Sequence, residues 1–265
     1  SLLRQEKYDV YNCGMAGNGF LIAYAALIEY ASIIKPKNVF WIYSSNDFAD
    51  LGNELKSDLL LKYLNNSKFS QGLAYKQSVI DSILQRYMNR RYNDFIKEKK
   101  NAGWSFLKLL KLIKTRNLIY RAKQNLYNYF KPFFNTNEET LLIKKNIIKS
   151  VDNSLISNVK DIFINSKDII EQWNGKLFFV YLPSGNNYLI GEEDPYKEYL
   201  ILLMKDLNIE FIDLTNDFLN HPDHLSLFPL QMLEAHYNHD GYRLVANKLI
   251  NTIKYDSLKS ISGGG

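Results

Sequence analysis

A chain of 265 residues, 46% of them hydrophobic, can bury a large core and has a common length for one α/β domain. Its formal net charge is +5, and its single cysteine, Cys13, excludes an internal disulfide framework and a metal cage built on several cysteines. The charge is uneven. Residues 86–131 hold thirteen Lys and Arg against two acidic residues, a local charge of +11, while the remainder carries twenty basic and twenty-six acidic residues, or −6. The basic character therefore belongs to one segment.

The first part of the chain predicts a βαβ unit. Residues 8–19 are typical of a short strand that ends in a glycine-rich turn, and residues 38–47 of a second, buried strand with a polar end. Between them, residues 20–34 form the longest apolar run. This run is too short to span a bilayer and contains Glu29, so we interpret it as a buried helix. A strand, a helix and a strand in this order predict parallel pairing with a right-handed crossover.

The same alternation returns near the end of the sequence. Residues 176–183 and 209–214 predict two strands, and residues 194–207 predict the helix between them. A last amphipathic helix follows the pair Asp240-Gly241, which is typical of a turn. The whole pattern predicts a three-layer, doubly wound α/β fold with a mainly parallel sheet, whose ligands bind beyond the carboxyl ends of the strands.

Residues 56–150 lack strand signals, have a helical period and are rich in Tyr, Lys and Asn. We therefore predict one α/β domain over residues 1–265 with a helical, basic insertion at 56–150. The basic part, residues 86–131, is interpreted first as a solvated face of helices packed on the core, with attraction to an anionic membrane surface or acidic polysaccharide as the alternative. No nucleic-acid partner is expected, because no recognised binding module accompanies the charge.

Polar residues that could stabilise a reacting group follow the first two predicted strands and precede the last helix. Gly17 lies in the turn after the first strand, where backbone N–H groups can point at an anion. Asn46 follows the second strand, and its amide with a glycine N–H would form an oxyanion hole. His236 lies two residues after Glu234, a spacing that suits a general base and the carboxylate that orients it. These residues indicate acyl chemistry, for which the nucleophile must come from elsewhere.

Each of these residues also has a plainer interpretation. Gly17 suits any tight turn, Asn46 is a common strand-end cap, and Glu234 and His236 could be solvated loop residues. The loop at residues 221–224 has two histidines and an aspartate, but it is interpreted as structural because it lacks a further Cys or His partner for a metal. The chain shows no signal peptide but begins without a start methionine, so the sequence leaves the compartment open between cytoplasm and export. It does not predict an oligomeric state.

Three stretches, "NCGMAGNG", "KPKNVFWIYSSND" and "HYNHDGYRLVA", occur in this order and resemble blocks of the SGNH (GDSL-like) hydrolase family. Members commonly read N-x-G-x-S-G-x-G, then K-P-D-x-V before a strand ending in G-N-D, and finally D-x-H or D-x-x-H before a G-H/Y-R-L-V-A helix. The resemblance covers residues 8–50 and 176–252 and does not define the insertion. Here Ala16 replaces a serine, Ser45 replaces a glycine, and Glu234 stands where the family has aspartate.

The resemblance implies a flavodoxin-like SGNH fold and a serine esterase or O-acyltransferase. Its substrates would be O-acyl groups, O-acetyl among them, of a carbohydrate or small ester. The oxyanion hole would consist of the Gly17 N–H and the Asn46 amide, with His236 as the catalytic base and Glu234 as its partner. The resemblance implies no cofactor and no metal, and it does not choose between hydrolysis and transfer.

The nucleophilic serine of the family lies in a Gly-Asp-Ser block ahead of all the matching residues. Ser1 is too close to the predicted strand at Tyr8 for the helix that should intervene, and Ser257 has no apolar strand before it. We therefore expect a central slot of the sheet to be filled, either by a segment outside these 265 residues or by another part of the chain. In the first case, that segment should bring the nucleophile to His236. The alternative is a catalytically inactive binding or scaffold protein of SGNH fold, whose basic insertion engages an anionic partner.

Overall fold

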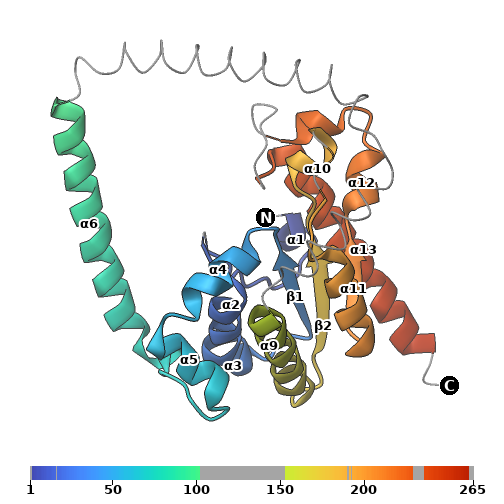
Figure 1. The fold of residues 1–265 in the computed structure, drawn as a ribbon, viewed down its shortest axis with the longest axis horizontal. Helices are drawn as coiled ribbons and strands as arrows, with labels where there is room; N and C mark the ends of the chain where they lie inside the picture. The colour runs from blue at the N-terminus through green and yellow to red at the C-terminus, as the bar shows by residue number, and fades with distance from the viewer. Residues whose placement is uncertain are drawn as a thin grey trace. The chain divides into compact units, whose positions relative to one another are not determined.

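The computed structural model describes residues 2–15, 17–101, 153–189, 191, 193–228 and 236–262 (Figure 1). The chain divides into two compact units. The first consists of residues 1–71 and 151–265, and the second of residues 72–150. The candidate site residues Gly17, Asn46 and His236 all belong to the first unit.

The first unit contains a parallel sheet of three strands, β1 (Asn38–Tyr43), β2 (Lys176–Tyr181) and β3 (Glu210–Asp213). Their order is β1-β2-β3, with Asn38 paired to Lys176 and Phe178 paired to Glu210. Three of the predicted strands are thereby confirmed, as is their parallel pairing. With helices beside the sheet, the arrangement is an α/β one.

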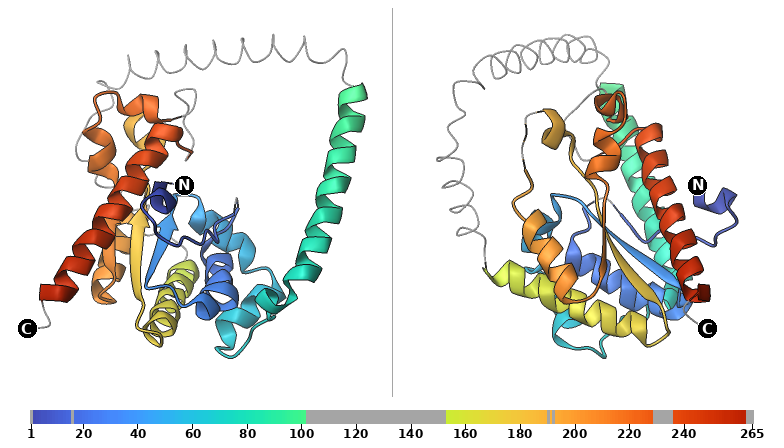
Figure 2. Two further views of the ribbon diagram at one scale, coloured as in Figure 1. Left: turned by 180° about the vertical axis from the view of Figure 1, so that it is seen from behind. Right: turned by 90° about the vertical axis from the view of Figure 1, so that its right-hand side faces the viewer.

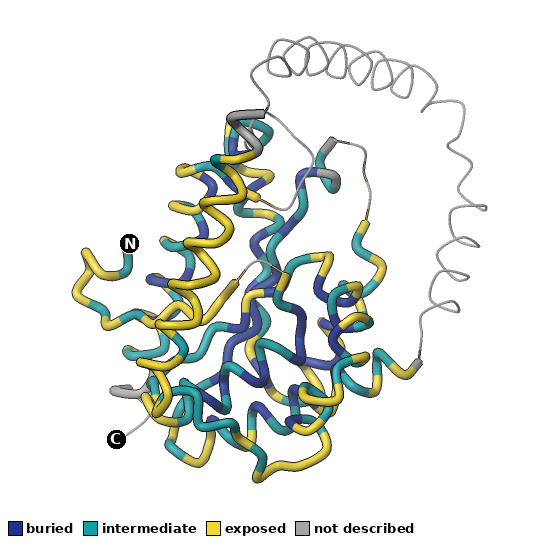
Figure 3. Tube along the Cα trace, turned by 90° about the vertical axis from the view of Figure 1, so that its left-hand side faces the viewer, coloured by how far each residue is buried: buried dark blue, intermediate teal, exposed yellow. Residues whose placement is uncertain are grey.

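The burial of the central strand β2 explains why its sequence is an unbroken apolar run after Lys176. Its last five residues are buried, because both faces of a parallel strand are covered by helices. Leu177, Phe179 and Tyr181 belong to one apolar cluster, whereas Phe178 and Val180 belong to a second cluster on the opposite face. Figure 3 shows buried residues gathered along the strands and on the helix surfaces turned toward them.

Helices pack on both faces of the sheet (Figure 2). The first face is covered by α2 (Phe20–Ala26), α9 (Asn153–Glu171) and α11 (Lys197–Asp206), and the second by α12 (Thr215–Leu219) and α13 (His239–Ser262). The remaining described elements of this unit are α1 (Leu2–Gln5), η1 (Leu27–Ala31), α3 (Ser32–Ile34), α4 (Asp47–Glu54), α5 (Asp58–Asn65), α10 (Gly185–Leu189) and η4 (His224–Leu227).

Aromatic side chains fill the core between the sheet and α2. The ring of Phe20 lies 5.0 Å from that of Phe48 and 5.9 Å from those of Tyr43 and Phe163, measured between centroids. Each such pair adds about 0.5–1.5 kcal/mol to the burial of its apolar area. Phe20 therefore fixes the first turn of α2 against the end of β1 and the start of α4.

The strand expected within residues 8–19 is not formed. Residues 8–15 have no regular secondary structure, and Tyr11 and Met15 are mostly exposed. A strand needs a neighbour for its ladder, and no described strand lies along the outer edge of β1. In consequence β1 is an edge strand among the described strands, and its Ile42 side chain is 48% exposed.

The pair Asp240-Gly241 was predicted to form a turn, but it lies in the first turn of α13. The helix begins at His239 because Asn238 accepts hydrogen bonds from the backbone N–H groups of Asp240 and Gly241 through its Oδ1 atom, as an N-cap does. A Cβ atom on Gly241 would lie 2.7 Å from the Tyr237 Cβ atom. Glycine at position 241 thus allows the first turn of α13 to lie close to Tyr237.

The described part of the second unit contains η2 (Leu73–Lys76) and α6 (Gln77–Asn101). The remainder of the predicted insertion, residues 102–150, lies outside the described residues. Among the helices that the structure describes, none is both long enough and apolar enough to cross a membrane.

Candidate functional site

Gly17 occupies a turn whose backbone requires glycine. Its φ angle is +79°, in the left-handed region that side chains disfavour. A Cβ atom there would meet nothing within 4 Å, so the requirement comes from the backbone conformation and not from crowding. The residue is exposed in the turn that precedes α2. Ala16 lies outside the described residues.

The buried Glu54 carboxylate joins this turn to α4. It accepts hydrogen bonds from the backbone N–H groups of Gly19, at 2.6 Å, and of Leu21, at 2.8 Å. These N–H groups belong to the entrance of α2, where the helix has no carbonyl partner for them. A Cβ atom on Gly19 would lie 2.9 Å from the Leu51 nitrogen and 3.0 Å from the Asp47 carbonyl oxygen. The entrance of α2 therefore contacts the α4 backbone directly.

Asn46 is the N-cap residue of α4 and directly precedes Asp47. Its Nδ2 atom donates a hydrogen bond to Asp50 Oδ2 at 2.7 Å, and the residue is exposed. A carboxamide has two N–H groups, so this bond uses one and fixes the direction of the other. The docking of Gly19 on Asp47 brings the Gly17 turn to the beginning of α4 and thus toward Asn46.

His236 is exposed on the segment that leads into α13. The residue after it, Tyr237, is buried and donates a hydrogen bond from its hydroxyl to the Pro183 carbonyl oxygen at 2.6 Å. The next residue, Asn238, donates its backbone N–H to the Leu227 carbonyl oxygen. Pro183 lies two residues beyond the end of β2, so His236 is held at the carboxyl edge of the sheet, as Asn46 is beyond β1. Glu234, the predicted partner of His236, lies outside the described residues.

A cluster of buried acids and tyrosines under this edge was not predicted. Tyr43, at the end of β1, donates its hydroxyl to Asp194 Oδ2 at 2.8 Å, and Tyr181, at the end of β2, bonds the same carboxylate. Asp47 lies nearby and is 7% exposed. Burial raises the pKa of Asp47 to about 8, and the nearby Asp50 carboxylate acts in the same direction. The hydrogen bond from the Ser44 N–H lowers the pKa but does not outweigh burial.

Asp47 was interpreted from the sequence only as a turn or cap residue, and it does accept the Ser44 N–H at 3.2 Å. The carboxyl ends of neighbouring parallel strands meet at one edge, which is the signal that could have suggested a polar cluster there. Its raised pKa could not have been read from the sequence, because desolvation depends on the residues that folding brings around the carboxylate.

A third polar group lies at the end of β3. Lys197 forms an ion pair with Asp213 at 2.7 Å, and the Thr215 hydroxyl donates to the same carboxylate at 2.6 Å. Burial would raise the pKa of Asp213, but the Lys197 and Thr215 bonds outweigh it and the pKa is lowered. The Lys197 charge is therefore compensated within the protein.

The loop at residues 221–224 behaves as a structural element. The Asp223 side chain accepts the Ser226 N–H and caps η4, and the Asp223 N–H donates to His221 Nδ1 at 3.2 Å. In the portion of the chain that the structure describes, no group of three or more His, Cys, Asp or Glu side chains is placed to hold a metal ion.

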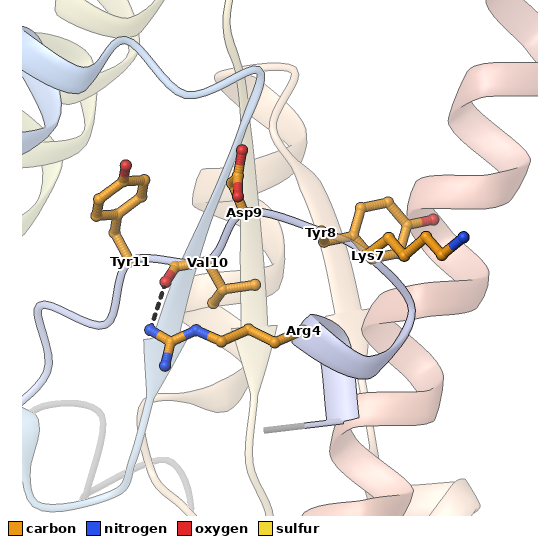
Figure 4. Close-up of a pocket in the computed structure, with 6 residues that line it drawn as sticks. All are labelled: Arg4, Lys7, Tyr8, Asp9, Val10 and Tyr11. Carbon is orange, nitrogen blue, oxygen red and sulfur yellow. Dashed lines mark hydrogen bonds between the residues drawn. The ribbon is translucent and has the colours of Figure 1, made fainter.

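A hollow of about 400 Å³ lies beside the N-terminal segment (Figure 4). It is lined by residues of one short stretch, Arg4 and residues 7–11, and the Arg4 guanidinium closes the stretch by donating to the Val10 carbonyl oxygen at 2.8 Å. None of the candidate residues lines it. The hollow results from the path of one exposed segment and carries no chemistry of its own.

Because of the close contact at Gly19, alanine should have opposite effects on the free energy of unfolding at Gly19, before α2, and at Gly52, within α4. Gly19→Ala should lower the free energy of unfolding by about 1–3 kcal/mol, because the new methyl group meets backbone atoms that cannot rotate away. Gly52→Ala is the matched control. It lies within α4 with nothing within 4 Å of its Cβ position, and should raise the free energy of unfolding by about 0.5–1 kcal/mol. Urea unfolding measures both, and equal effects would contradict the docking of Gly19 on the α4 backbone.

Fold and site define an α/β protein with polar residues gathered at the carboxyl edge of a parallel sheet, the place where proteins of this class bind ligands. Comparison of the chain with protein-family models, with curated proteins and with solved structures finds no match.

Proposed function

We propose that this chain belongs to an SGNH-type serine ester hydrolase or O-acyltransferase. The observation that carries the proposal is the joining of the Gly17 turn to the start of α4 through Glu54 and Gly19. The proposal is supported by the contact of Gly19 with Asp47, the residue after the exposed Asn46, and by the hydrogen bond of Tyr237, the residue after the exposed His236, to Pro183 beyond the end of β2. The fold proposed with it is the three-layer, doubly wound, flavodoxin-like arrangement, with residues 56–150 as a helical insertion.

In the proposed reaction a serine Oγ attacks the carbonyl carbon of an O-acyl group, and His236 takes the proton of the hydroxyl. The oxygen of the tetrahedral intermediate accepts hydrogen bonds from the Gly17 N–H and the second N–H of Asn46. His236 returns the proton to the leaving alkoxide, and the acyl group passes to water or to an acceptor hydroxyl. Glu234 would orient the imidazole. O-acyl groups of a carbohydrate or small ester, O-acetyl among them, are the substrates proposed.

The described strands leave no empty central slot, because β2 pairs with β1 on one side and β3 on the other. We propose instead that the strand with the nucleophile pairs at the outer edge of β1. The sequence of β1, "NVFWIY", has no charged residue and no proline, and its outer N–H and C=O groups have no ladder partner among the described residues. The unpaired N–H and C=O groups of such an edge can form a ladder with another strand. By contrast, β3 at the other edge is four residues long and has Glu210 and Asp213 at its ends. Pairing at β1 would place the end of the added strand beside Ser44 and Asn46.

A second candidate is a binding protein of the same fold without catalysis. It is favoured by one observation: no serine hydroxyl bonds to His236 in the part of the chain that the structure describes. The two candidates differ in whether a nucleophile is present.

The test of the proposed function is covalent labelling of the full-length protein with a fluorophosphonate, followed by peptide mapping. A hydrolase should be labelled at one serine, and His236→Ala should abolish the labelling because the serine loses its base. His239→Ala serves as the control, since that imidazole is exposed and contacts Arg243 and Asp240. A protein that takes no label would be the binding protein.

A further inference from the structure

We propose that α6 binds the surface of an anionic lipid membrane, with its apolar side chains in the headgroup region and its arginines on lipid phosphates. The helix (Gln77–Asn101) lies in the second unit and far along the chain from Asn46 and His236. The proposal concerns a surface and not the ester chemistry, so it does not depend on the proposed function.

The first observation is an exposed apolar stripe. The large side chains of α6 that are more than half exposed include Ile83 (52%), Leu84 (53%), Tyr87 (56%), Met88 (60%) and Tyr92 (64%). The spacings of three and four residues place them as neighbours along one side of the helix. A contiguous exposed apolar patch of this kind marks an interaction surface.

The second observation is uncompensated positive charge on the same helix. Between residues 77 and 97, α6 has four basic and two acidic residues. Arg86 and Arg90 are four residues apart, so their charges repel along the helix. Neither of them, nor Arg91, forms an ion pair with a carboxylate of the described residues; Arg86 Nε instead donates to the Ser82 carbonyl oxygen. The helix is therefore complementary to an anionic partner.

The chemistry of the stripe favours a lipid surface over a groove on a protein. Arg91 lies within the stripe, three residues after Met88 and four after Tyr87, where a protein groove would have to supply a buried carboxylate for it. At a membrane surface the arginine stem lies along the apolar region while its guanidinium reaches the phosphates. Tyrosine prefers the same interface, because its ring is apolar and its hydroxyl is polar. An amphipathic, basic helix with these residues lies in the plane of the interface.

Vesicle flotation of the full chain tests the inference. The protein should float with vesicles of phosphatidylcholine mixed with phosphatidylserine, and not with phosphatidylcholine alone. Binding should weaken as salt is added, because the phosphates and arginines are screened. The triple variant Arg86→Gln, Arg90→Gln, Arg91→Gln should bind the anionic vesicles roughly one hundredfold less, since each basic residue near such a surface contributes about a fivefold factor.

Two further variants distinguish the contribution of the α6 arginines from that of the apolar stripe and from that of basic residues elsewhere in the chain. The double variant Leu84→Gln, Met88→Gln should also lose binding while its charge is unchanged. Replacing Lys56, Lys68 and Lys205, which are exposed in the first unit, by glutamine removes the same charge and should leave binding nearly intact. The inference is overturned if the wild-type chain ignores anionic vesicles, if the arginine variant binds as the wild type does, or if only an acidic polysaccharide such as heparin retains the protein.

Discussion

If the proposed esterase function holds, replacing His236 by alanine should lower the kcat of ester hydrolysis by roughly three to six orders of magnitude, because the proposed serine nucleophile would lose its base. The residue is exposed, so the substitution leaves the core intact, and the free energy of unfolding should stay within about 0.5 kcal/mol of the wild-type value. Hydrolysis of p-nitrophenyl acetate by the full-length protein measures the first quantity and urea unfolding the second.

His239→Ala is the matched control for this prediction. His239 lies three residues further on, in the first turn of α13, and its side chain is 76% exposed beside Asp240. It should lose little activity. If His236→Ala kept the full rate, or if both variants lost it equally, His236 would not be the base.

The stability of the protein should fall as the pH rises from about 4 to about 8, in part through Asp47. Its folded-state pKa of about 8 lies above the ordinary value of 3.8, so between these values the folded protein holds a proton that the unfolded chain has released. The contribution of Asp47 is fully present below about pH 4 and is lost as the pH passes through about 8. Asp47→Asn cannot ionise, and should exceed the wild type by about 2–5 kcal/mol in free energy of unfolding at about pH 9.

Urea unfolding at several pH values checks this expectation. Asp206→Asn, at an exposed position at the end of α11, is the control and should give a profile parallel to that of the wild type. Burial also raises the pKa values of Glu54 and Asp194, so a smaller decline with pH should persist in Asp47→Asn. Identical slopes for Asp47→Asn and the wild type would show that Asp47 ionises normally in the folded protein.

The sequence predicted which residues belong to the candidate site, but it did not predict the contacts around them. Gly17, Asn46 and His236 were identified by their places beside strands and a helix, and the structure places them in one unit beside those elements. The hydrogen bonds of Glu54 to Gly19 and Leu21 were not foreseen, because they join residues more than thirty positions apart. No local pattern records such a contact.

The sequence by itself predicted β1, β2 and β3 and three of the helices that cover them, α2, α11 and α13, whereas α9 and α12 were not predicted. Each predicted element is a run of apolar residues with a clear period between turn residues, and burial of such a run follows from its own composition. Only the tertiary structure decided that residues 8–15 form no strand, that Asp240-Gly241 lies within a helix and that Asp47 is protonated near neutral pH. A strand requires a partner, a helix entrance requires a cap, and a pKa shift requires desolvation, and all three depend on residues distant in the chain.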